Sequence, residues 1–396
     1  MMYRALTEAA AVEYARSVPG LFSGDAPLQS REIGDGNLNL VFQVRENGGE
    51  GRSVIIKQAL PYIRVIGDSY PLTLDRARIE CEVLQIENEY DPGRVPKVYH
   101  YDAELALFIM EDLSEYLIMR KGLVDRKQYP NFPEHIGRFL ARSLFLSSEY
   151  ALESGVKKAL VKRYINPELC KLSEDVIFTD PYSDSPRNRC NPLIQEMAVA
   201  LRHDAQLKLE VAKLKEKFLT HAQALVHGDL HTGSIMITET DTRVIDPEFA
   251  YYGPMGFDIG ALFANLLLNH AAHIGHTPDP LERGAYQQYL LDTIGGVWNI
   301  FVEEFRSLWK DRIIEASANT EGYLDYLLIS ILQDTAGFTG CKMIRRIVGI
   351  AHVSDLESIA DEQLRAEAEK NALANARRLI VNRSQISTIN ELINMI

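Results

Sequence analysis

The chain has 396 residues, of which 46% are hydrophobic and 24% are charged, as expected of a globular protein with two or three domains. Its formal net charge of −13 and its pI near 5.3 argue against a nucleic-acid or anionic-membrane partner, because both would favour a basic face. Four widely spaced cysteines without a Cys-x-x-Cys pair suggest neither a disulfide framework nor a zinc site, and they fit the reducing cytoplasm. No run approaches the roughly 18 uninterrupted apolar residues of a transmembrane helix, so none is expected.

Residues 31–59 predict a β-hairpin near the start of the chain. A glycine-containing loop at residues 34–39 carries Asn37 and Asn39, and Lys57 lies inside the second strand. A charged residue after an apolar run needs a partner or a polar cleft, and a phosphate would satisfy it. The order of loop and lysine is that of a phosphate-covering loop followed by a phosphate-pairing lysine. The sequence therefore predicts that Asn37, Asn39 and Lys57 bind ATP; the other interpretation is an ordinary turn and a strand-edge lysine in solvent.

Residues 74–89 carry apolar side chains at near-helical spacing and predict a helix that packs against the hairpin. Glu80 and Glu82 are acidic residues of this helix, and either can pair with Lys57 and orient it, as a lysine–glutamate pair does in protein kinases. We expect Glu80 to be the partner, while ordinary solvated helix charge is the alternative for both glutamates.

The apolar strand at residues 105–113 ends in an acidic turn, where we place a hinge. A hinge strand can bind adenine through backbone N–H and C=O groups, which leaves its side chains free to vary. The predicted adenine-binding residues are Met110, Glu111, Asp112 and Leu113.

A domain boundary is expected at this hinge, between residues 1–113 and residues 114–396. The second part turns largely helical, with one irregular, proline-containing segment at residues 178–192 that is typical of a surface loop. Apolar periodicity predicts helices in this part at residues 259–268, 341–350 and 356–381.

The stretch from His227 to Ser234 is the most informative of the chain, with Asp229 inside it and Asp246 17 positions after Asp229. Runs of β-branched residues precede both aspartates, so we expect each at the end of a short strand, where carboxylates can converge. Phosphoryl transfer from ATP needs an oriented hydroxyl and metal-neutralised phosphates more than covalent help from the protein. Acidic groups in this arrangement therefore indicate a kinase.

Each acid then has an expected role. Asp229 accepts or orients the acceptor hydroxyl, while Asp246 and Glu248 hold Mg²⁺, which prefers carboxylate, phosphate and water oxygens. Ser234 stands five residues after Asp229, where protein kinases have a metal-binding Asn, and is a weaker ligand. Under this hypothesis Glu248 supplies the negative charge that Ser234 lacks. The other interpretation of Asp246-Pro247-Glu248 is a surface turn.

The segment after the metal motif indicates a small acceptor. Only ten positions separate Glu248 from Asp258, which leaves little room for the long activation segment on which protein kinases dock their substrates. His227-Gly228-Asp229 also lacks the arginine of the protein-kinase His-Arg-Asp motif. Asp258 precedes an apolar helix, so it either caps that helix or braces the catalytic loop.

These motifs make the chain similar, over its full length, to the methylthioribose kinase family, within the aminoglycoside-phosphotransferase and choline-kinase-like branch of the protein-kinase-like fold. The resemblance rests on residues 227–234, on residues 246–250 with the following residues 253–258, and on the pair Arg345-Arg346. Related small-molecule kinases usually have Asn at the position of Ser234.

The resemblance implies an α+β, two-lobed protein-kinase-like fold, with a small β-rich N-terminal lobe and a large, mainly helical C-terminal lobe. It implies transfer of the ATP γ-phosphate to the 1-hydroxyl of 5-methylthioribose, a step of methionine salvage, with Asp229 as base and Mg²⁺ on the acids. It also implies that Arg345, Arg346 and Tyr70 contact the sugar, and that the protein is a cytoplasmic homodimer. Adjacent residues of a helix point about 100° apart, so one arginine can bind while its neighbour braces. Surface arginines in weak ion pairs are the alternative.

Two other functions are open at this stage. The first is a kinase of the same fold that acts on another small alcohol, such as choline, homoserine or an aminoglycoside. The second is a catalytically silent nucleotide-binding module. A silent module would keep a full set of costly charges at Lys57, Asp229, Asp246 and Glu248 without using them, so the acids argue against it.

Overall fold

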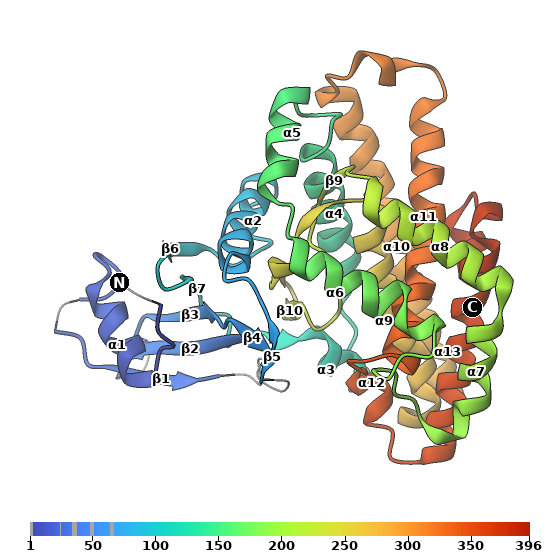
Figure 1. Ribbon diagram of the computed structural model, residues 1–396, viewed down its shortest axis with the longest axis horizontal. Coiled ribbons are helices and arrows are strands. Elements are labelled where there is room, and N and C mark those ends of the chain that lie inside the picture. The colour runs from blue at the N-terminus through green and yellow to red at the C-terminus, as the bar shows by residue number, and fades with distance from the viewer. Residues whose placement is uncertain (1–2, 24, 34–37, 48–50, 64–66) are drawn as a thin grey trace. The chain divides into compact units, whose positions relative to one another are not determined.

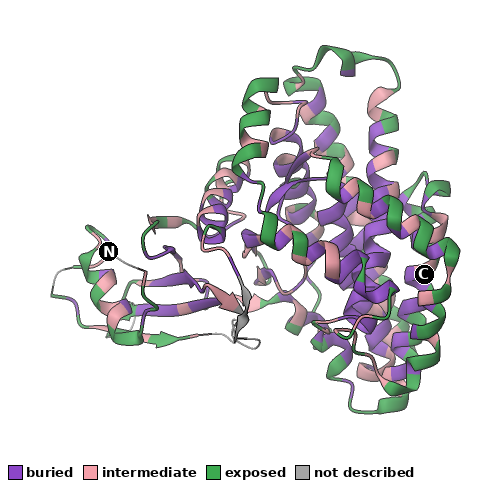
Figure 2. Ribbon diagram, in the orientation of Figure 1, coloured by how far each residue is buried: buried purple, intermediate pink, exposed green. Residues whose placement is uncertain are grey.

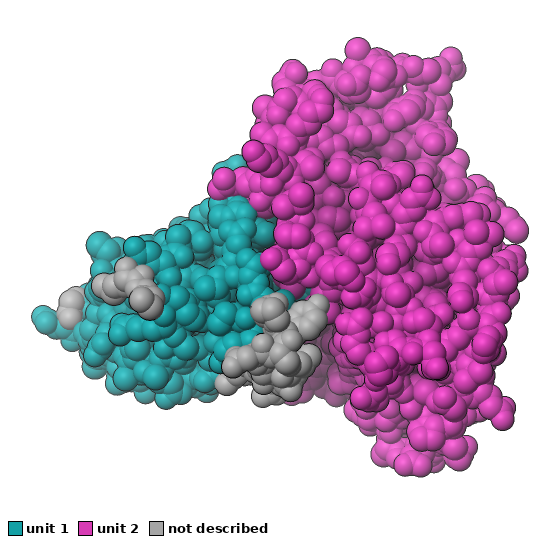
Figure 3. Space-filling model, in the orientation of Figure 1, with its two compact units in different colours: residues 1–116, 243–250 teal, residues 117–242, 251–396 magenta. Residues whose placement is uncertain are grey.

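The structure is a computed structural model that describes residues 3–23, 25–33, 38–47, 51–63 and 67–396. It divides into two compact units (Figure 3). Unit 1 comprises residues 1–116 together with 243–250, and unit 2 comprises residues 117–242 together with 251–396. None of the described helices combines the length and the apolar character needed to span a membrane.

Unit 1 is built on a five-stranded antiparallel sheet with the strand order β1-β2-β3-β7-β6 (Figure 1). The strands are β1 (Leu28–Glu32), β2 (Asn39–Glu46), β3 (Ser53–Ala59), β6 (Val98–Asp102) and β7 (Leu107–Glu111). The unit also contains the short strands β4 (Tyr62–Ile63) and β5 (Gly67–Pro71), the helices α1 (Glu8–Ser17) and α2 (Arg76–Tyr90), and the 3-10 turn η3 (Pro247–Phe249).

Side chains alternate between the two faces along each strand, so one face of this sheet is apolar and the other carries Lys57. On one face, Phe42, Val54 and Ile56 are buried in an apolar core that is completed by Ala11 and Ala15 of α1. Successive side chains of a strand point to opposite faces, so Lys57 leaves β3 on the other side. Helix α2 lies against that side. The sheet thus places one buried lysine beneath one helix.

Unit 2 is mainly helical. Its helices are α3 (Met119–Val124), α4 (Phe132–Leu146), α5 (Ser154–Arg163), α6 (Pro167–Phe178), α7 (Gln195–His203), α8 (Ala205–Thr220), α9 (Gly256–His276), α10 (Pro280–Arg312), α11 (Tyr323–Val348), α12 (Ser354–Glu357), α13 (Glu362–Asn382) and α14 (Ile389–Ile393). The 3-10 turns are η1 (Asp180–Tyr182), η2 (Pro192–Ile194), η4 (Ala316–Asn319) and η5 (Arg383–Gln385). Short strands lie among them: β8 (Leu117–Ile118) pairs with β10 (Ile235–Ile237), and β9 (Ala224–Val226) pairs with β12 (Tyr251–Gly253). Strand β11 (Thr242–Val244) begins at the last residue of unit 2 before the segment 243–250 of unit 1.

The centre of unit 2 is formed by α9 and the second half of α11, which are buried over almost every residue (Figure 2). Gly260 of α9 permits a close approach, because a Cβ there would lie 2.8 Å from the Cβ of Phe338 and 2.9 Å from the carbonyl oxygen of Thr335. The position of α11 is therefore set by backbone-to-backbone packing, and its last turns are held rigidly in the core.

The expected α+β class is confirmed, as are the hairpin of β2 and β3, the helix α2 and the strand β7. The helix expected at residues 341–350 is the end of the much longer α11. The single helix expected at residues 356–381 is wrong, because α12 ends at Glu357 and α13 begins at Glu362. Asp361 causes the interruption: its carboxylate accepts hydrogen bonds from the N–H groups of Gln363 and Leu364 and starts a new helix.

Candidate active site

Lys57 is the centre of a charged cluster in unit 1. Its Nζ lies 2.6 Å from Oε1 of Glu80 and 2.5 Å from Oδ1 of Asp246, and its side chain is only 5% exposed. Burial alone would lower the pKa of this ammonium, but the neighbouring carboxylates, Asp246 first, outweigh burial and raise the pKa above its ordinary value. Burial also raises the pKa of Glu80, so the more exposed Asp246 is the better counterion. Lys57 is held as a cation.

Of the two glutamates considered as partners of Lys57, Glu80 is the one that pairs with this lysine. Glu82 pairs instead with Arg78, at 2.9 Å and one turn back on the same helix. Glu80 follows Arg76 by four residues, so both side chains leave α2 on one face. That face carries the contact of Glu80 with Lys57 and the contact of Arg76 with Glu248.

Arg76 is fully buried and connects three parts of the same unit. Its Nε donates to Oε2 of Glu248 at 3.1 Å, and its Nη2 donates to the carbonyl oxygen of Leu38 and to Oδ1 of Asn39. Asn39 in turn donates from Nδ2 to Oε2 of Glu248 at 3.1 Å. The side chain of Asn39 is therefore engaged with protein groups, and Glu248 is fixed by two donors.

The turn that carries the two acids has an unusual backbone. Asp246 has a φ of 65°, in the left-handed region that Asp tolerates better than most residues, and η3 follows at once. This turn places Asp246 and Glu248 beside the same lysine, since both contribute to the raised pKa of Lys57. Two carboxylates of this kind fit Mg²⁺, which usually takes one or two protein carboxylates and completes its shell with phosphates and water.

No group of three or more His, Cys, Asp or Glu side chains is arranged to hold a metal among the residues that the structure describes. A Mg²⁺ site of the phosphate-completed kind does not need one. Ser234, the third predicted ligand, is buried in unit 2 and donates from Oγ to the carbonyl oxygen of Asp229 at 3.2 Å. Its hydroxyl thus has a role within the loop, and metal ligation by Ser234 stays a prediction.

The expected adenine-binding segment runs through the end of β7. Asp112 accepts hydrogen bonds from Ser53 at 2.5 Å and Gln43 at 2.6 Å, which anchor the segment to the sheet. Within the described residues, the backbone N–H of Leu113 donates to no protein acceptor. That group has the chemistry that a purine nitrogen requires, although adenine binding by Met110, Glu111, Asp112 and Leu113 stays a prediction.

Two predicted site residues are outside what the structure describes. Asn37 lies in the undescribed segment 34–37. Tyr70 belongs to β5 by its backbone, but its side chain is not described. Both assignments stay predictions.

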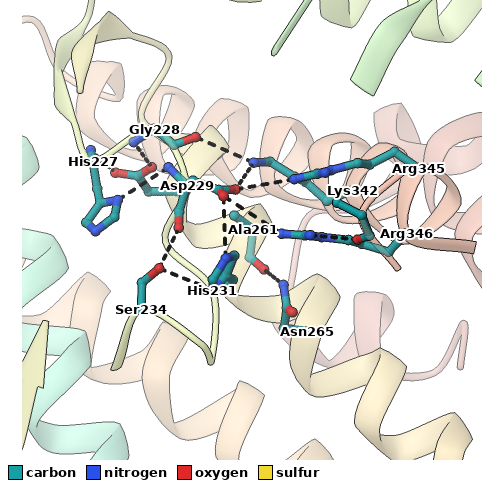
Figure 4. A network of polar contacts seen from close by, with 12 residues as sticks. His227, Gly228, Asp229, His231, Ser234, Ala261, Asn265, Lys342, Arg345 and Arg346 are labelled. Atoms are coloured by element: carbon teal, nitrogen blue, oxygen red, sulfur yellow. Dashed lines mark hydrogen bonds and ion pairs between the residues drawn. The ribbon is translucent and has the colours of Figure 1, made fainter. Parts of the chain in front are cut away.

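Asp229 is the centre of a second cluster, which lies in unit 2 (Figure 4). Nζ of Lys342 lies 2.9 Å from Oδ1 of Asp229. Nη2 of Arg345 is 3.7 Å from Oδ1, and Nη2 of Arg346 is 3.8 Å from Oδ2. All three cations project from the end of α11 toward one carboxylate, so positive charge exceeds negative charge around Asp229.

This surplus controls ionisation in the cluster. Burial alone would raise the pKa of Asp229, but Lys342 above all, with both arginines, holds that pKa well below its ordinary value. His231 lies 3.4 Å from Oδ2 of Asp229, yet burial holds its pKa well below the usual range, so the imidazole is neutral at pH 7. Asp229 is therefore an ionised carboxylate across the physiological range.

The loop that carries Asp229 is braced from α9. The carboxylate of Asp258 accepts hydrogen bonds from the backbone N–H of His227 at 2.6 Å and of Gly228 at 3.0 Å. Gly228 has a φ of 86°, which a side chain would strain. Asp258 makes no side-chain cap to α9, so of the two expected roles the structure supports the brace.

The two predicted arginines have different partners. Arg346 donates from Nη1 to the carbonyl oxygen of Ala351 at 2.7 Å. Arg345, whose side chain is 8% exposed, makes no hydrogen bond to any residue that the structure describes, and its Nε is buried without a partner. Both are buried, so the alternative of solvated surface arginines is wrong.

Sequence reasoning missed Lys342, Arg76 and Arg120. Lys342 precedes Arg345 and Arg346 by three and four residues, so helical spacing alone would have put all three on one face. Arg76 shares the face of Glu80 in the same way. Arg120 forms an ion pair at 3.1 Å with the buried Asp355 and donates from its backbone N–H to the carbonyl oxygen of Thr232. No local pattern indicated Arg120.

A buried lysine–glutamate–aspartate cluster, an Asp-x-Glu turn and a braced His-Gly-Asp loop together define a phosphotransferase that acts on small molecules. The chain belongs to the phosphotransferase enzyme family, whose sequence model matches residues 29–299. Methylthioribose kinase from Geobacillus sp. (strain WCH70) is 45% identical to it over 99% of this chain and 95% of that protein. Methylthioribose kinase from Yersinia enterocolitica serotype O:8 / biotype 1B (strain NCTC 13174 / 8081) is 44% identical over 99% and 98%. Within the family, the chain therefore groups with the methylthioribose kinases, and the expected protein-kinase-like fold is confirmed.

Among solved structures, choline kinase from Cryptosporidium parvum Iowa II is similar with a TM-score of 0.49 and 13% sequence identity, over 93% of this chain and 94% of that one. Nothing about the acceptor of this chain follows from so distant a likeness.

Proposed function

We propose that this chain transfers the γ-phosphoryl group of ATP to the 1-hydroxyl of 5-methylthioribose, releasing ADP, the sugar 1-phosphate and a proton, as a step of methionine salvage. The observation that carries the proposal is the identity of about 45% along nearly the whole chain with proteins named methylthioribose kinase. The match covers both units, so the segments that carry the nucleotide-site and acceptor-site residues lie within it.

Each cluster has a chemical task in this reaction. Asp229 accepts a hydrogen bond from the 1-hydroxyl and receives its proton as the new P–O bond forms. Lys57, held as a cation by Asp246 and Glu80, pairs with the ATP phosphates. The backbone of residues 110–113 binds adenine, Asn37 belongs to the loop that covers the phosphates, and Asn39 follows this loop as the first residue of β2.

We further propose that Asp246 and Glu248 hold Mg²⁺, with Ser234 as a weaker ligand. Their oxygens are hard donors, and the surplus of carboxylates around Lys57 favours a second cation. When bound, this ion neutralises phosphate charge and orients the γ-phosphoryl group. Arg76 and Asn39 hold Glu248 for that purpose, because both donate to its Oε2.

The charge around Asp229 favours a neutral sugar over the cationic acceptors of related enzymes. Lys342, Arg345 and Arg346 all lie within 4 Å of its carboxylate. A choline or an aminoglycoside would bring further positive charge to this surplus, which costs several kcal/mol at close range, on the order of 3. Arginine donors instead suit sugar hydroxyls and the phosphate being formed, so we propose Arg345, Arg346 and Tyr70 as sugar contacts.

A homodimer in the cytoplasm is also part of the proposal, and it rests on the family resemblance. Light scattering of the purified protein tests the dimer: the expected mass is twice the chain mass of 44.7 kDa. A mass of one chain at micromolar concentration contradicts it.

The test of the activity is ADP release from Mg-ATP with a panel of acceptors: methylthioribose, choline, homoserine and an aminoglycoside. Turnover is expected with methylthioribose alone. Asp229→Asn should lower kcat by about 10³-fold, because it removes the proton acceptor, whereas Asp311→Asn, an exposed aspartate of α10, should leave kcat unchanged. Preference for another alcohol would remove the substrate assignment, and an active Asp229→Asn enzyme would remove the base.

A further inference from the structure

We propose that Lys342 is a positioning residue of the acceptor site, which fixes the Asp229 carboxylate through one oxygen so that the other oxygen faces the acceptor hydroxyl. The inference rests on the proposed function, since it assigns a role within the same reaction. It concerns a residue that neither the motifs nor the resemblance singled out.

The contacts of Lys342 are specific to one carboxylate oxygen. Its Nζ donates to Oδ1 of Asp229 at 2.9 Å and to the carbonyl oxygen of Gly228 at 3.5 Å. Its side chain is 3% exposed and passes over the ring of Phe257, with Nζ 4.5 Å from the ring centroid. Oδ2 of Asp229 receives no hydrogen bond from any residue that the structure describes. One oxygen is therefore fixed, and the other remains an acceptor for substrate.

Lys342 is also the cation best suited to this task. Arg345 and Arg346 lie at 3.7 and 3.8 Å from the carboxylate, beyond hydrogen-bond distance. Among the described residues, only Lys342 makes a direct hydrogen bond to the carboxylate of Asp229. The two guanidiniums then keep their donors for the sugar and its phosphate, while the ammonium holds the base. This division explains why three cations surround one aspartate.

The charge on Lys342 is sensitive to pH, because the groups that favour its charged form are nearly balanced by those that oppose it. Asp229 on the catalytic loop and Asp258 on α9 favour the charged form, whereas Arg345 and Arg346 on the same helix oppose it. His231 of the same loop is neutral at pH 7. Burial, the largest influence, lowers the pKa of Lys342 to about 8. Lys342 is therefore charged below that pH and neutral above it, and the anchored carboxylate loses its counterion on the alkaline side.

A purely structural lysine would behave differently, and the chain offers a matched control. Lys217 of α8 also pairs with a buried aspartate of α11, at 2.6 Å from Oδ1 of Asp334. That pair has no contact with the loop of Asp229 among the described residues. Removing either lysine takes away the nearest cation of an aspartate that has further arginine partners, so both substitutions are expected to lower stability. Only the Lys342 variant should change the pH dependence of turnover.

The experiment compares wild type, Lys342→Met, Lys342→Arg and Lys217→Met in Mg-ATP turnover between about pH 6 and pH 10. Wild type is expected to lose kcat above a pH of about 8. Lys342→Met should lower kcat at pH 7 by about 10²-fold with the KM for ATP unchanged, as for loss of one preorganised charged donor. Lys342→Arg should recover part of kcat and abolish the alkaline loss, because arginine keeps its charge. Lys217→Met should keep the wild-type kcat and pH profile. Thermal unfolding of each variant establishes that it is folded.

Two results would overturn the inference: a wild-type profile without an alkaline loss, or an alkaline loss that persists unchanged in Lys342→Arg. If Lys342→Met does not fold, Lys342→Arg and the wild-type profile still decide between these outcomes. Failure of the proposed function is distinguishable, because it appears as absence of turnover with methylthioribose in wild type. In that case the same profiles are measured on the acceptor that wild type prefers, or on ATP hydrolysis with water as the acceptor.

Discussion

Arg345 and Arg346 are adjacent in the chain and equally buried, but their guanidinium groups differ in what satisfies them. Arg346 donates to Ala351, a residue with a φ of 56°, and so holds a left-handed turn just after α11. Among the described residues, the guanidinium of Arg345 has only its ion pair with Asp229, which is too long for a hydrogen bond. A buried guanidinium without hydrogen bonds is costly, so Arg345 is the arginine that most needs a ligand.

Opposite effects on stability follow from this difference. Arg346→Met should lower the free energy of unfolding by about 1–3 kcal/mol, because a charged hydrogen bond to the turn after α11 is lost. Arg345→Met should leave stability unchanged or raise it by about 1 kcal/mol, since an uncompensated buried charge is removed. Both should raise the KM for methylthioribose. Urea unfolding of the two variants measures the difference, and equal losses of stability would contradict the division of roles.

At the residue scale, sequence patterns located most charged groups but not their partners. The pair Arg345-Arg346 was recognisable, but only the structure shows that Arg346 hydrogen-bonds to Ala351 and that Arg345 has an ion pair with Asp229. Glu80 and Glu82 were equivalent as sequence, and Arg78 decides between them by pairing with Glu82. Lys342 escaped notice because attention fell on the adjacent pair Arg345-Arg346, and the lysine itself belonged to no motif.

Helix α2 shows how one element can serve both halves of the nucleotide cluster. Glu80 reaches Lys57 from one turn, and Arg76 reaches Glu248 from the turn before. Arg78, on a different face, pairs with Asp75 and Glu82 of its own segment. The rotation of α2 about its axis therefore sets the positions of both Lys57 and Glu248.

This arrangement predicts a metal-specific defect. Arg76→Met should raise the Mg²⁺ concentration for half-maximal turnover by about tenfold or more, as expected when a residue that orients a ligand is lost. Arg78→Met should leave it unchanged. The measurement is a Mg²⁺ titration of turnover at fixed ATP, run with EDTA-stripped enzyme. An unchanged Mg²⁺ requirement in Arg76→Met would show that Arg76 does not act through Glu248.

At the element scale, sequence periodicity predicted strands and helices where one face is apolar, as in β3 and α2. It failed at residues 356–381, where apolar spacing continues through a break that Asp361 creates by capping. It also located only residues 341–350 of α11, because charged and small residues replace the apolar stripe in the buried half of this helix. Gly260 explains part of that pattern: the helices α9 and α11 touch too closely there for a larger side chain.

For the molecule as a whole, the formal charge of −13 conceals a strongly positive acceptor cluster. Composition does not indicate this cluster, because the cations on α11 around Asp229 are buried rather than spread over the surface. Chemistry of this kind depends on where charges gather in the fold, which neither net charge nor spacing reveals. The acceptor itself was inferred from family resemblance, and the charge of the cluster supports it independently.

The central claim is that one phosphoryl group passes from ATP to the anomeric oxygen of methylthioribose. Phosphorus NMR of the product formed by the wild-type enzyme tests it most directly, because coupling identifies the carbon that bears the phosphate. The account predicts a monoester phosphorus coupled to the proton on carbon 1, together with one equivalent of ADP. A phosphate coupled to a proton on any other carbon, or release of orthophosphate with the sugar unchanged, would contradict it.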